Sequence, residues 1–396
     1  MALTKIQFAP GVNKEGTEYS ADSGWFDSDK VRFRKGRPEK IGGWRKFAES
    51  FFLGVCRSIH DWASLESIKY IGLGTNLKFY VAEGSNFNDV TPIRLTTSAG
   101  DVTFAAVNGS STITVTDTAH GAVVNDFVTY TDAATLGGNI TAVVLNQEYQ
   151  IVSVPTTSTY TITAKDTDGN AVTANASDSG NGGSSTVGAY QINTGLNTFV
   201  DGTGWGAGTW GSSTWGSSSA VSAAGQLRLW NQDNFGEDLL LNIRGGGIFY
   251  WDESSGTGAR AVNITSLGGA SNVPTVALQV MVSDTDQHVI AFGTNPIGSS
   301  NIDPLFVRFS DQENVADWTP TSTNSAGGVR INSGSLIIGA VQTRQEILIW
   351  TDVSLHSMRF IGAPFIFEFT RLSSDVSMIS PKAAVNARGS VYFMDR

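Results

Sequence analysis

The sequence holds a single cysteine, Cys56, among its 396 residues. One cysteine cannot form an internal disulfide, so we expect a fold that does not depend on an oxidising compartment. Charge is also scarce: only 16% of residues are charged, and 26 basic against 36 acidic residues give a formal net charge of −10. This balance argues against the whole chain being a nucleic-acid binder held by phosphate contacts.

Long apolar runs are missing as well. None approaches the ~20 residues needed to cross a bilayer, so we expect no membrane span. Residues 1–11 lack the basic-then-apolar pattern of a secretion signal. We therefore expect the protein to be made and folded in a cytoplasm.

Histidine is rare too, and the sequence offers no metal-ligand spacing. His60, His120, His288 and His356 have no partner three or four residues away and no Cys/His cluster. No nucleophile elbow, phosphate-binding loop or dinucleotide fingerprint stands out either. We expect no catalytic residue, no metal and no cofactor, and hence a protein that is not an enzyme.

Glycine, by contrast, is abundant, with 44 residues alongside 40% hydrophobic residues. This mixture favours an all-β protein with many turns. The most regular stretch is residues 238–252, where two short apolar runs flank Arg244 and three glycines. Glycine tolerates the positive φ of a tight turn, so the stretch predicts a β-hairpin.

Looser copies of this hairpin recur along the chain. They fall at residues 68–81, 288–309, 346–369 and 390–394. Leaving out one insert, the spacing is roughly 45–55 residues, which is typical of β-propeller blades. The strand at 390–394 has no partner in the pattern, which predicts either a truncated chain or an edge completed by another segment or chain.

Residues 97–195 differ from the repeats. They contain one basic residue, Lys165, and eight acidic ones: Asp101, Asp117, Asp126, Asp132, Glu148, Asp166, Asp168 and Asp178. Alternating strand signals at 112–116, 127–130, 149–154 and 160–163 predict a small inserted β-sandwich or barrel. Residues 180–185 are glycine-rich and suggest an exit linker.

The sequence thus predicts a β-propeller-like body of repeated hairpin blades with that inserted domain and an extended N-terminal arm. We divide the chain into a basic arm (1–50), a first repeat (51–96), the acidic insert (97–195), and a Trp/Gly loop with the remaining repeats (196–396).

The arm carries the main charged feature of the sequence. Residues 30–46 hold eight basic residues against Glu39, a net of 8 − 1 = +7. In the strand signal at 31–34, valine and phenylalanine alternate with two arginines. The candidate interface residues are Lys30, Arg32, Arg34, Lys35 and Arg37. They form either a solvated strand face, a docking surface for an acidic partner or neighbouring subunit, or a direct DNA contact.

A second candidate is aromatic. Trp205, Trp210 and Trp215 recur every five residues within a glycine-rich loop. Such a run is either a sugar-binding platform or a loop whose rings pack against the body or a neighbouring subunit.

Two acidic clusters allow both a chemical and a structural interpretation. Residues 166–170 resemble part of a calcium loop but lack its later glutamate, so a hairpin turn is the alternative. Asp311, Glu313 and Asp317 offer carboxylates for glycoside cleavage, or they are turn-forming acids.

Three stretches resemble a known family. Residues 28–43, 235–251 and 308–320 are similar to the tail nozzle (tail tubular protein B) and packaged-DNA-stabilisation hub proteins of short-tailed phages. The resemblance covers the arm and the repeats, and members of that family are longer than this chain. It carries over no catalytic residue.

The resemblance implies a virion protein of the tail, assembled in the host cytoplasm. It implies a homo-oligomeric ring, expected to be hexameric. The implied partner proteins are the tail adaptor ring below the portal, and tail fibres or needle and plug proteins. Packaged DNA would pass through the lumen without specific binding, and a negative lumen would let it slide. The alternatives are a carbohydrate-binding or depolymerising tail protein, and a propeller scaffold of the host.

Overall fold

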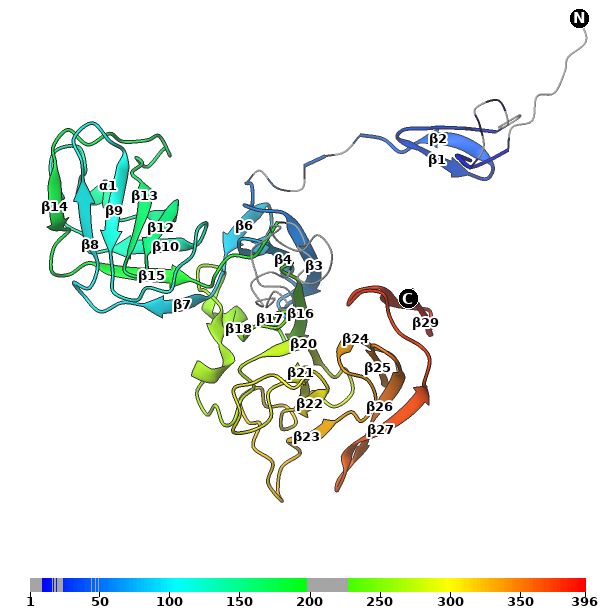
Figure 1. Ribbon diagram of the computed structural model, residues 1–396. Coiled ribbons are helices and arrows are strands. Elements are labelled where there is room, and N and C mark those ends of the chain that lie inside the picture. Colours follow the sequence, from blue (N-terminus) through cyan, green and yellow to red (C-terminus); the bar gives the residue numbers. More distant parts are fainter. Residues whose placement is uncertain are drawn as a thin grey trace, which may run out of the picture. The chain divides into compact units, whose positions relative to one another are not determined.

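The computed structural model describes residues 9–15, 17, 19, 24–43, 45, 46, 48, 50–197 and 227–396. It divides into two compact units, Met1–Glu49 and Ser50–Arg396. Strands dominate both (Figure 1), and within the described residues the α-helical structure is a single turn, α1 (Ala142–Leu145). The predicted all-β fold is confirmed.

The described residues of the arm unit form one hairpin. β1 (Val31–Arg34) pairs antiparallel with β2 (Arg37–Lys40) in the register Val31↔Lys40. The two turn residues, Lys35 and Gly36, both have positive φ, at 51° and 77°, as a tight hairpin turn with right-handed strand twist requires. Val31 and Phe33 are half-buried while Arg32 and Arg34 are exposed, so the predicted alternation is confirmed.

Among its described residues, the second unit has four antiparallel sheets whose four strands follow one another in sequence. Sheet 1 comprises β3 (Cys56–Ala63), β4 (Lys69–Thr75), β5 (Phe79–Glu83) and β6 (Asn86–Asp89). Sheet 2 comprises β16 (Trp230–Phe235), β17 (Asp238–Ile243), β18 (Ile248–Trp251) and β19 (Val262–Asn263).

Sheets 3 and 4 repeat this order. Sheet 3 comprises β20 (Ala277–Val282), β21 (Val289–Thr294), β22 (Phe306–Phe309) and β23 (Gly327–Arg330). Sheet 4 comprises β24 (Ile337–Gln342), β25 (Ile347–Thr351), β26 (Leu355–Gly362) and β27 (Ile366–Ser373). β17 and β18 are the hairpin expected at 238–252, and their register Leu241↔Phe249 confirms it.

The core of this body lies between sheets. One apolar cluster joins sheets 1 and 2, a second joins sheets 2 and 3, and a third joins sheets 3 and 4. The first strands of successive sheets contact one another in series, from β3 through β16 and β20 to β24. Stacked four-stranded sheets with adjoining first strands are what a propeller requires, and the propeller-like arrangement itself stays a prediction.

The last predicted strand has a partner. β29 (Ser390–Phe393) pairs with β28 (Ala384–Ala387) in a two-stranded sheet, so of the two alternatives the edge completed by another segment is the one that the structure shows. β28 was missed because its sequence, Ala-Val-Asn-Ala, has little apolar alternation. β28 contacts β24 in turn, and the ring of Phe393 lies 5.5 Å from that of Trp350.

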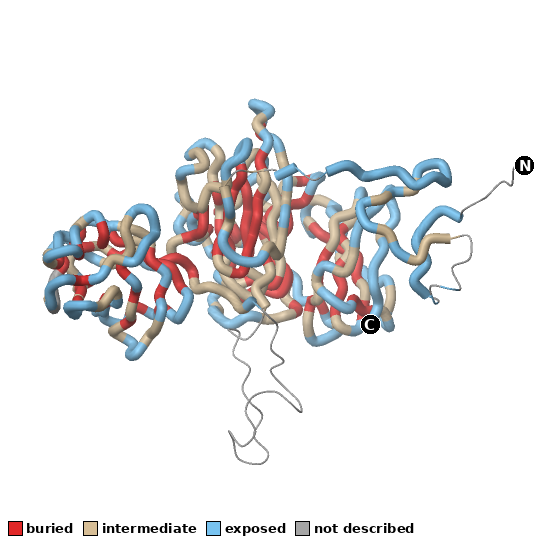
Figure 2. The backbone as a smooth tube through the Cα atoms, turned by 90° about the horizontal axis from the view of Figure 1, so that it is seen from above, coloured by how far each residue is buried: buried red, intermediate tan, exposed pale blue. Residues whose placement is uncertain are grey.

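The insert is a module of two sheets. One contains β11 (Glu148–Gln150), β10 (Phe127–Thr131), β15 (Val187–Gln191) and β7 (Ile93–Thr96), in that order. The other contains β12 (Ser153–Thr156), β13 (Thr159–Thr163), β9 (Thr112–Thr116), β8 (Thr103–Ala106) and β14 (Asp178–Asn181). Figure 2 shows buried residues in the module as well as in the body.

Two expectations about the module are wrong. The run 149–154 is two strands in different sheets, because the chain crosses between them at the fully buried Ile151. Residues 180–185 are not a linker, since β14 pairs with β8 and the chain then enters β15.

Candidate functional site

The five basic candidates of the arm lie together. Lys30 immediately precedes β1, and the others lie on the β1–β2 hairpin; all five are exposed. Arg32 Nε forms an ion pair of 3.2 Å with Glu39 Oε2 across the hairpin, a contact worth little in solvent. The hairpin therefore presents a cationic surface. Trp205, Trp210 and Trp215 lie outside the described residues.

The acids at 311–317 are engaged in turns. Asp317 accepts hydrogen bonds from the backbone N–H of Thr319 at 3.0 Å and from Asn324 Nδ2 at 3.1 Å. Asp311 accepts from both the N–H and the hydroxyl of Ser325, at 2.8 and 2.7 Å. Two of the three carboxylates are thus used to hold the loop between β22 and β23, which favours the structural interpretation of this cluster.

The same loop reaches a buried histidine that sequence reasoning left without a role. His288 Nδ1 lies 2.5 Å from Asp286 Oδ2, and His288 Nε2 lies 2.9 Å from Ser325 Oγ. The histidine side chain is fully buried and that of Asp286 is 2% exposed. Three phenylalanine rings surround the imidazole: Phe309, Phe360 and Phe367.

The order Asp286, His288, Ser325 is that of a nucleophile triad, but the Ser325 hydroxyl hydrogen is directed to Asp311 and not to the histidine. A hydroxyl has one hydrogen, and Ser325 donates it to Asp311. Ser325 therefore has no hydrogen left for His288 Nε2, whereas a nucleophilic serine must donate its hydrogen to the histidine. The hydrogen-bonded residues Asp286, His288, Ser325 and Asp311 are suited to holding the 310–326 loop against the start of β21.

The electrostatics of Asp311 agree with this role. Burial opposes ionisation of the carboxyl, but the hydrogen bonds from the N–H and hydroxyl of Ser325 and the N–H of Gln312 outweigh it and lower the pKa of Asp311. The ionised Asp311 carboxylate thus accepts the last hydrogen bonds of this group of residues.

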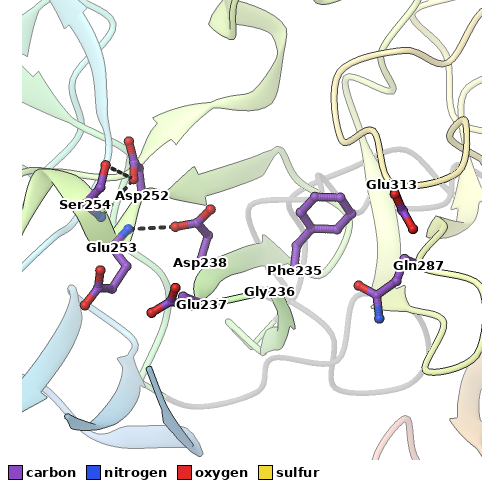
Figure 3. A pocket seen from close by; sticks show the side chains of 9 residues that line it. All are labelled: Phe235, Gly236, Glu237, Asp238, Asp252, Glu253, Ser254, Gln287 and Glu313. Atoms are coloured by element: carbon purple, nitrogen blue, oxygen red, sulfur yellow. Dashed lines mark hydrogen bonds between the residues drawn. The ribbon is translucent and has the colours of Figure 1, made fainter. Parts of the chain in front are cut away.

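An acidic pocket of about 570 Å³ lies on the body beside this loop. Figure 3 shows the Phe235 ring between Asp238 on one side and Gln287 and Glu313 on the other. The lining includes five carboxylates: Glu237, Asp238, Asp252, Glu253 and Glu313.

Most of these carboxylates already have internal partners. Asp238 accepts the N–H of Glu253 at 2.8 Å and the hydroxyl of Tyr250. Glu253 accepts the hydroxyl of Tyr70 at 2.9 Å, and Glu237 accepts the N–H of Leu65 at 2.8 Å. The walls of the pocket are consequently turns and strand ends, and the hydrogen bonds of these carboxylates hold them together.

No cluster of three His, Cys, Asp or Glu side chains in the described part of the chain has the geometry to hold a metal ion. The turn at 166–170 is built on Asp166, whose carboxylate accepts the N–H groups of Asp168 and Asn170 at 3.0 and 2.8 Å. A search of the described residues for a helix long and apolar enough to cross a membrane finds none.

Comparisons with known proteins identify no family. No family model matches the chain, and no curated protein matches it. Among solved structures, phage phi92 endosialidase is 11% identical with a TM-score of 0.23, over 78% of this chain and 45% of that one. PorZ, an essential surface component of the type-IX secretion system of Porphyromonas gingivalis, is 11% identical with a TM-score of 0.25, over 92% and 39%.

This chain therefore spans less than half the length of either structure. At such TM-scores the two likenesses carry no argument about the function of this protein.

Proposed function

We propose that the chain is a structural subunit of a short phage tail, forming the nozzle or hub ring through which packaged DNA leaves. The observation that carries the proposal is the separation of charge between the two units. Met1–Glu49 holds 10 of the 26 basic and 7 of the 36 acidic residues, which leaves 16 basic and 29 acidic, a net of −13, in Ser50–Arg396.

This separation fits two tasks. An acidic body repels the DNA backbone, so DNA moves past it without sticking. The exposed cationic hairpin of the arm fits an acidic protein surface, on a neighbouring subunit or on an adaptor ring. The resemblance of residues 28–43, 235–251 and 308–320 to nozzle and hub proteins points to the same role.

The test replaces Arg32, Arg34 and Lys35 together by Ala. We expect fewer rings by native mass measurement and negative-stain imaging, and fewer DNA-filled tailed particles. The matched control replaces three exposed basic residues of the body, Lys69, Arg371 and Arg388, by Ala. Normal tailed particles from the arm variant would contradict the proposal, and release of glycan fragments that depends on the tryptophans at 205–215 would favour the carbohydrate alternative.

A further inference from the structure

Four charged side chains meet where the inserted module joins the body. Lys78 Nζ lies 2.7 Å from Asp89 Oδ2 and 2.6 Å from Glu148 Oε2. Arg260 lies 3.3 Å from Asp89 and 3.6 Å from Glu148. We call these residues the four-charge junction. Asp89 lies on β6, Lys78 lies between β4 and β5, and Arg260 lies between β18 and β19, so all three belong to the body. Glu148, on β11, is the member that the module contributes.

The junction is balanced in charge, and its lysine is shielded from solvent. It contains two cations and two carboxylates, and the side chain of Lys78 is only 3% exposed. The Lys78 ammonium also lies 4.4 Å above the Phe127 ring of the module. Asp89 is desolvated, but Lys78 and Arg260 outweigh this effect and lower its pKa. Each charge depends on the others for its stabilisation.

A second polar contact lies at the exit of the module. The buried carboxylate of Asp126 accepts the N–H of Thr194 at 2.8 Å and Asn193 Nδ2 at 2.5 Å. Arg228 donates to the carbonyl of Asn193 from the body side. Here too, the contact is built from hydrogen bonds and charge.

The apolar core of the module, in contrast, is separate from the apolar core of the body. Every residue of the module's buried cluster lies between Val102 and Tyr190. The cluster between sheets 1 and 2 takes no residue from that range, and its nearest members are Val90 and Ile192 on the two connecting segments. The module therefore keeps its own core when the polar contacts open. Polar interfaces between separate cores permit relative domain motion.

We propose that the inserted module is a hinged domain which the four-charge junction holds in its docked position, and that breaking the ion pairs of Glu148 releases it as a folded unit. Because Glu148 and Arg260 keep 31% and 29% of their side chains exposed, high salt reaches and weakens their ion pairs, whereas an interface of buried apolar side chains is not weakened in this way. The inference concerns the mechanics of this chain and does not depend on the proposed role in a tail.

The experiment measures the distance between module and body by single-molecule energy transfer in the full chain. Cys56→Ser removes the native thiol, and Asn108→Cys and Ser300→Cys place dyes at two exposed turns, one in the module and one in sheet 3. We expect one narrow distribution at low salt. Glu148→Lys should raise the undocked fraction by roughly tenfold or more, and about 1 M salt should raise it in the parent protein.

Asp168→Lys is the matched control, because it reverses an exposed charge of the same module away from the junction. Glu148→Gln and Arg260→Gln are milder variants should Glu148→Lys fail to fold, and hydrogen exchange in β10 and β13 reports whether the module stays folded. A single unchanged distribution in the folded Glu148 variants at both salts would overturn the proposal. So would an equal response in Asp168→Lys.

Discussion

Gln279 and Ala340 exchange two hydrogen bonds between the first strands of sheets 3 and 4. Gln279 Nε2 donates to the Ala340 carbonyl at 2.8 Å, and the Ala340 N–H donates to Gln279 Oε1 at 2.9 Å. The side-chain amide thus takes the place of a paired backbone residue between two sheets that share no strand ladder.

Related contacts join the other sheets. Gln232 Nε2 on β16 donates to Ser58 Oγ on β3 at 2.6 Å. Asn231 Nδ2 donates to the Leu278 carbonyl on β20 at 3.1 Å, and Asn386 Nδ2 on β28 donates to the Gln342 carbonyl on β24, also at 3.1 Å. An amide side chain therefore bridges each sheet to the next, beside the apolar clusters that join them.

We predict that Gln279→Met destabilises the body by about 1–3 kcal/mol, because it keeps the side-chain length but leaves the Ala340 amide and carbonyl without their partner. Urea unfolding followed by tryptophan fluorescence measures the change. Gln345→Met is the control, since Gln345 is exposed. Equal stability of the two variants would show that the amide contact contributes nothing.

A glycine on β4 is predicted to be intolerant of any side chain. A Cβ on Gly74 would lie 2.5 Å from Cδ1 of the fully buried Trp230 on β16. Gly74→Ala should therefore push sheets 1 and 2 apart and cost about 1–3 kcal/mol. Thermal unfolding tests this against Gly258→Ala, where a Cβ meets no atom within 4 Å. A Gly74→Ala protein as stable as the control would contradict the close packing.

Local patterns predicted much of the fold. The alternation at 112–116 is β9, and the glycine turn at 244–247 joins β17 to β18. β20 was missed because it is buried along its whole length except at Gln279 and so does not alternate. β23 was missed because its residues, Gly-Gly-Val-Arg, are largely exposed and give no apolar signal.

The sites were less predictable, for a physical reason. The basic hairpin is contiguous in sequence, so its residues could be named in advance. The members of the four-charge junction come from positions 78, 89, 148 and 260, and no local pattern links them. His288 and Ser325 are likewise 37 residues apart. Only the fold brings such groups together.

The module contains a buried chain of tyrosine hydroxyls that gives a further prediction. Tyr130 and Tyr160 hydroxyl oxygens are 2.5 Å apart, those of Tyr160 and Tyr190 are 2.8 Å apart, and Tyr190 donates to Asp117 at 2.6 Å. Tyr160→Phe removes the middle hydroxyl and leaves two buried polar groups without one of their partners. We expect a loss of about 1–3 kcal/mol.

Hydrogen exchange of β10, β13 and β15 measures this loss within the full chain, since faster exchange confined to these strands reports opening of the module. Tyr392→Phe is the control, because Tyr392 is 65% exposed. Unchanged exchange in Tyr160→Phe would mean that the hydroxyl chain does not stabilise the module.

The last prediction concerns acid stability and the donors around Asp311. Folding lowers the pKa of this carboxyl, chiefly through Ser325 against the opposing effect of burial. A lowered pKa adds stability above the pKa of the unfolded chain, and that stability is lost as pH falls. Between about pH 5 and pH 3, the wild type should therefore lose more stability than Ser325→Ala, which lacks the hydroxyl donor. Urea unfolding across this range tests the difference, with Ser322→Ala as an exposed-serine control. If Ser325→Ala and Ser322→Ala lose stability in parallel, the Ser325 hydroxyl does not hold Asp311 ionised, and the argument that Ser325 donates its hydrogen to Asp311 and not to His288 loses its support.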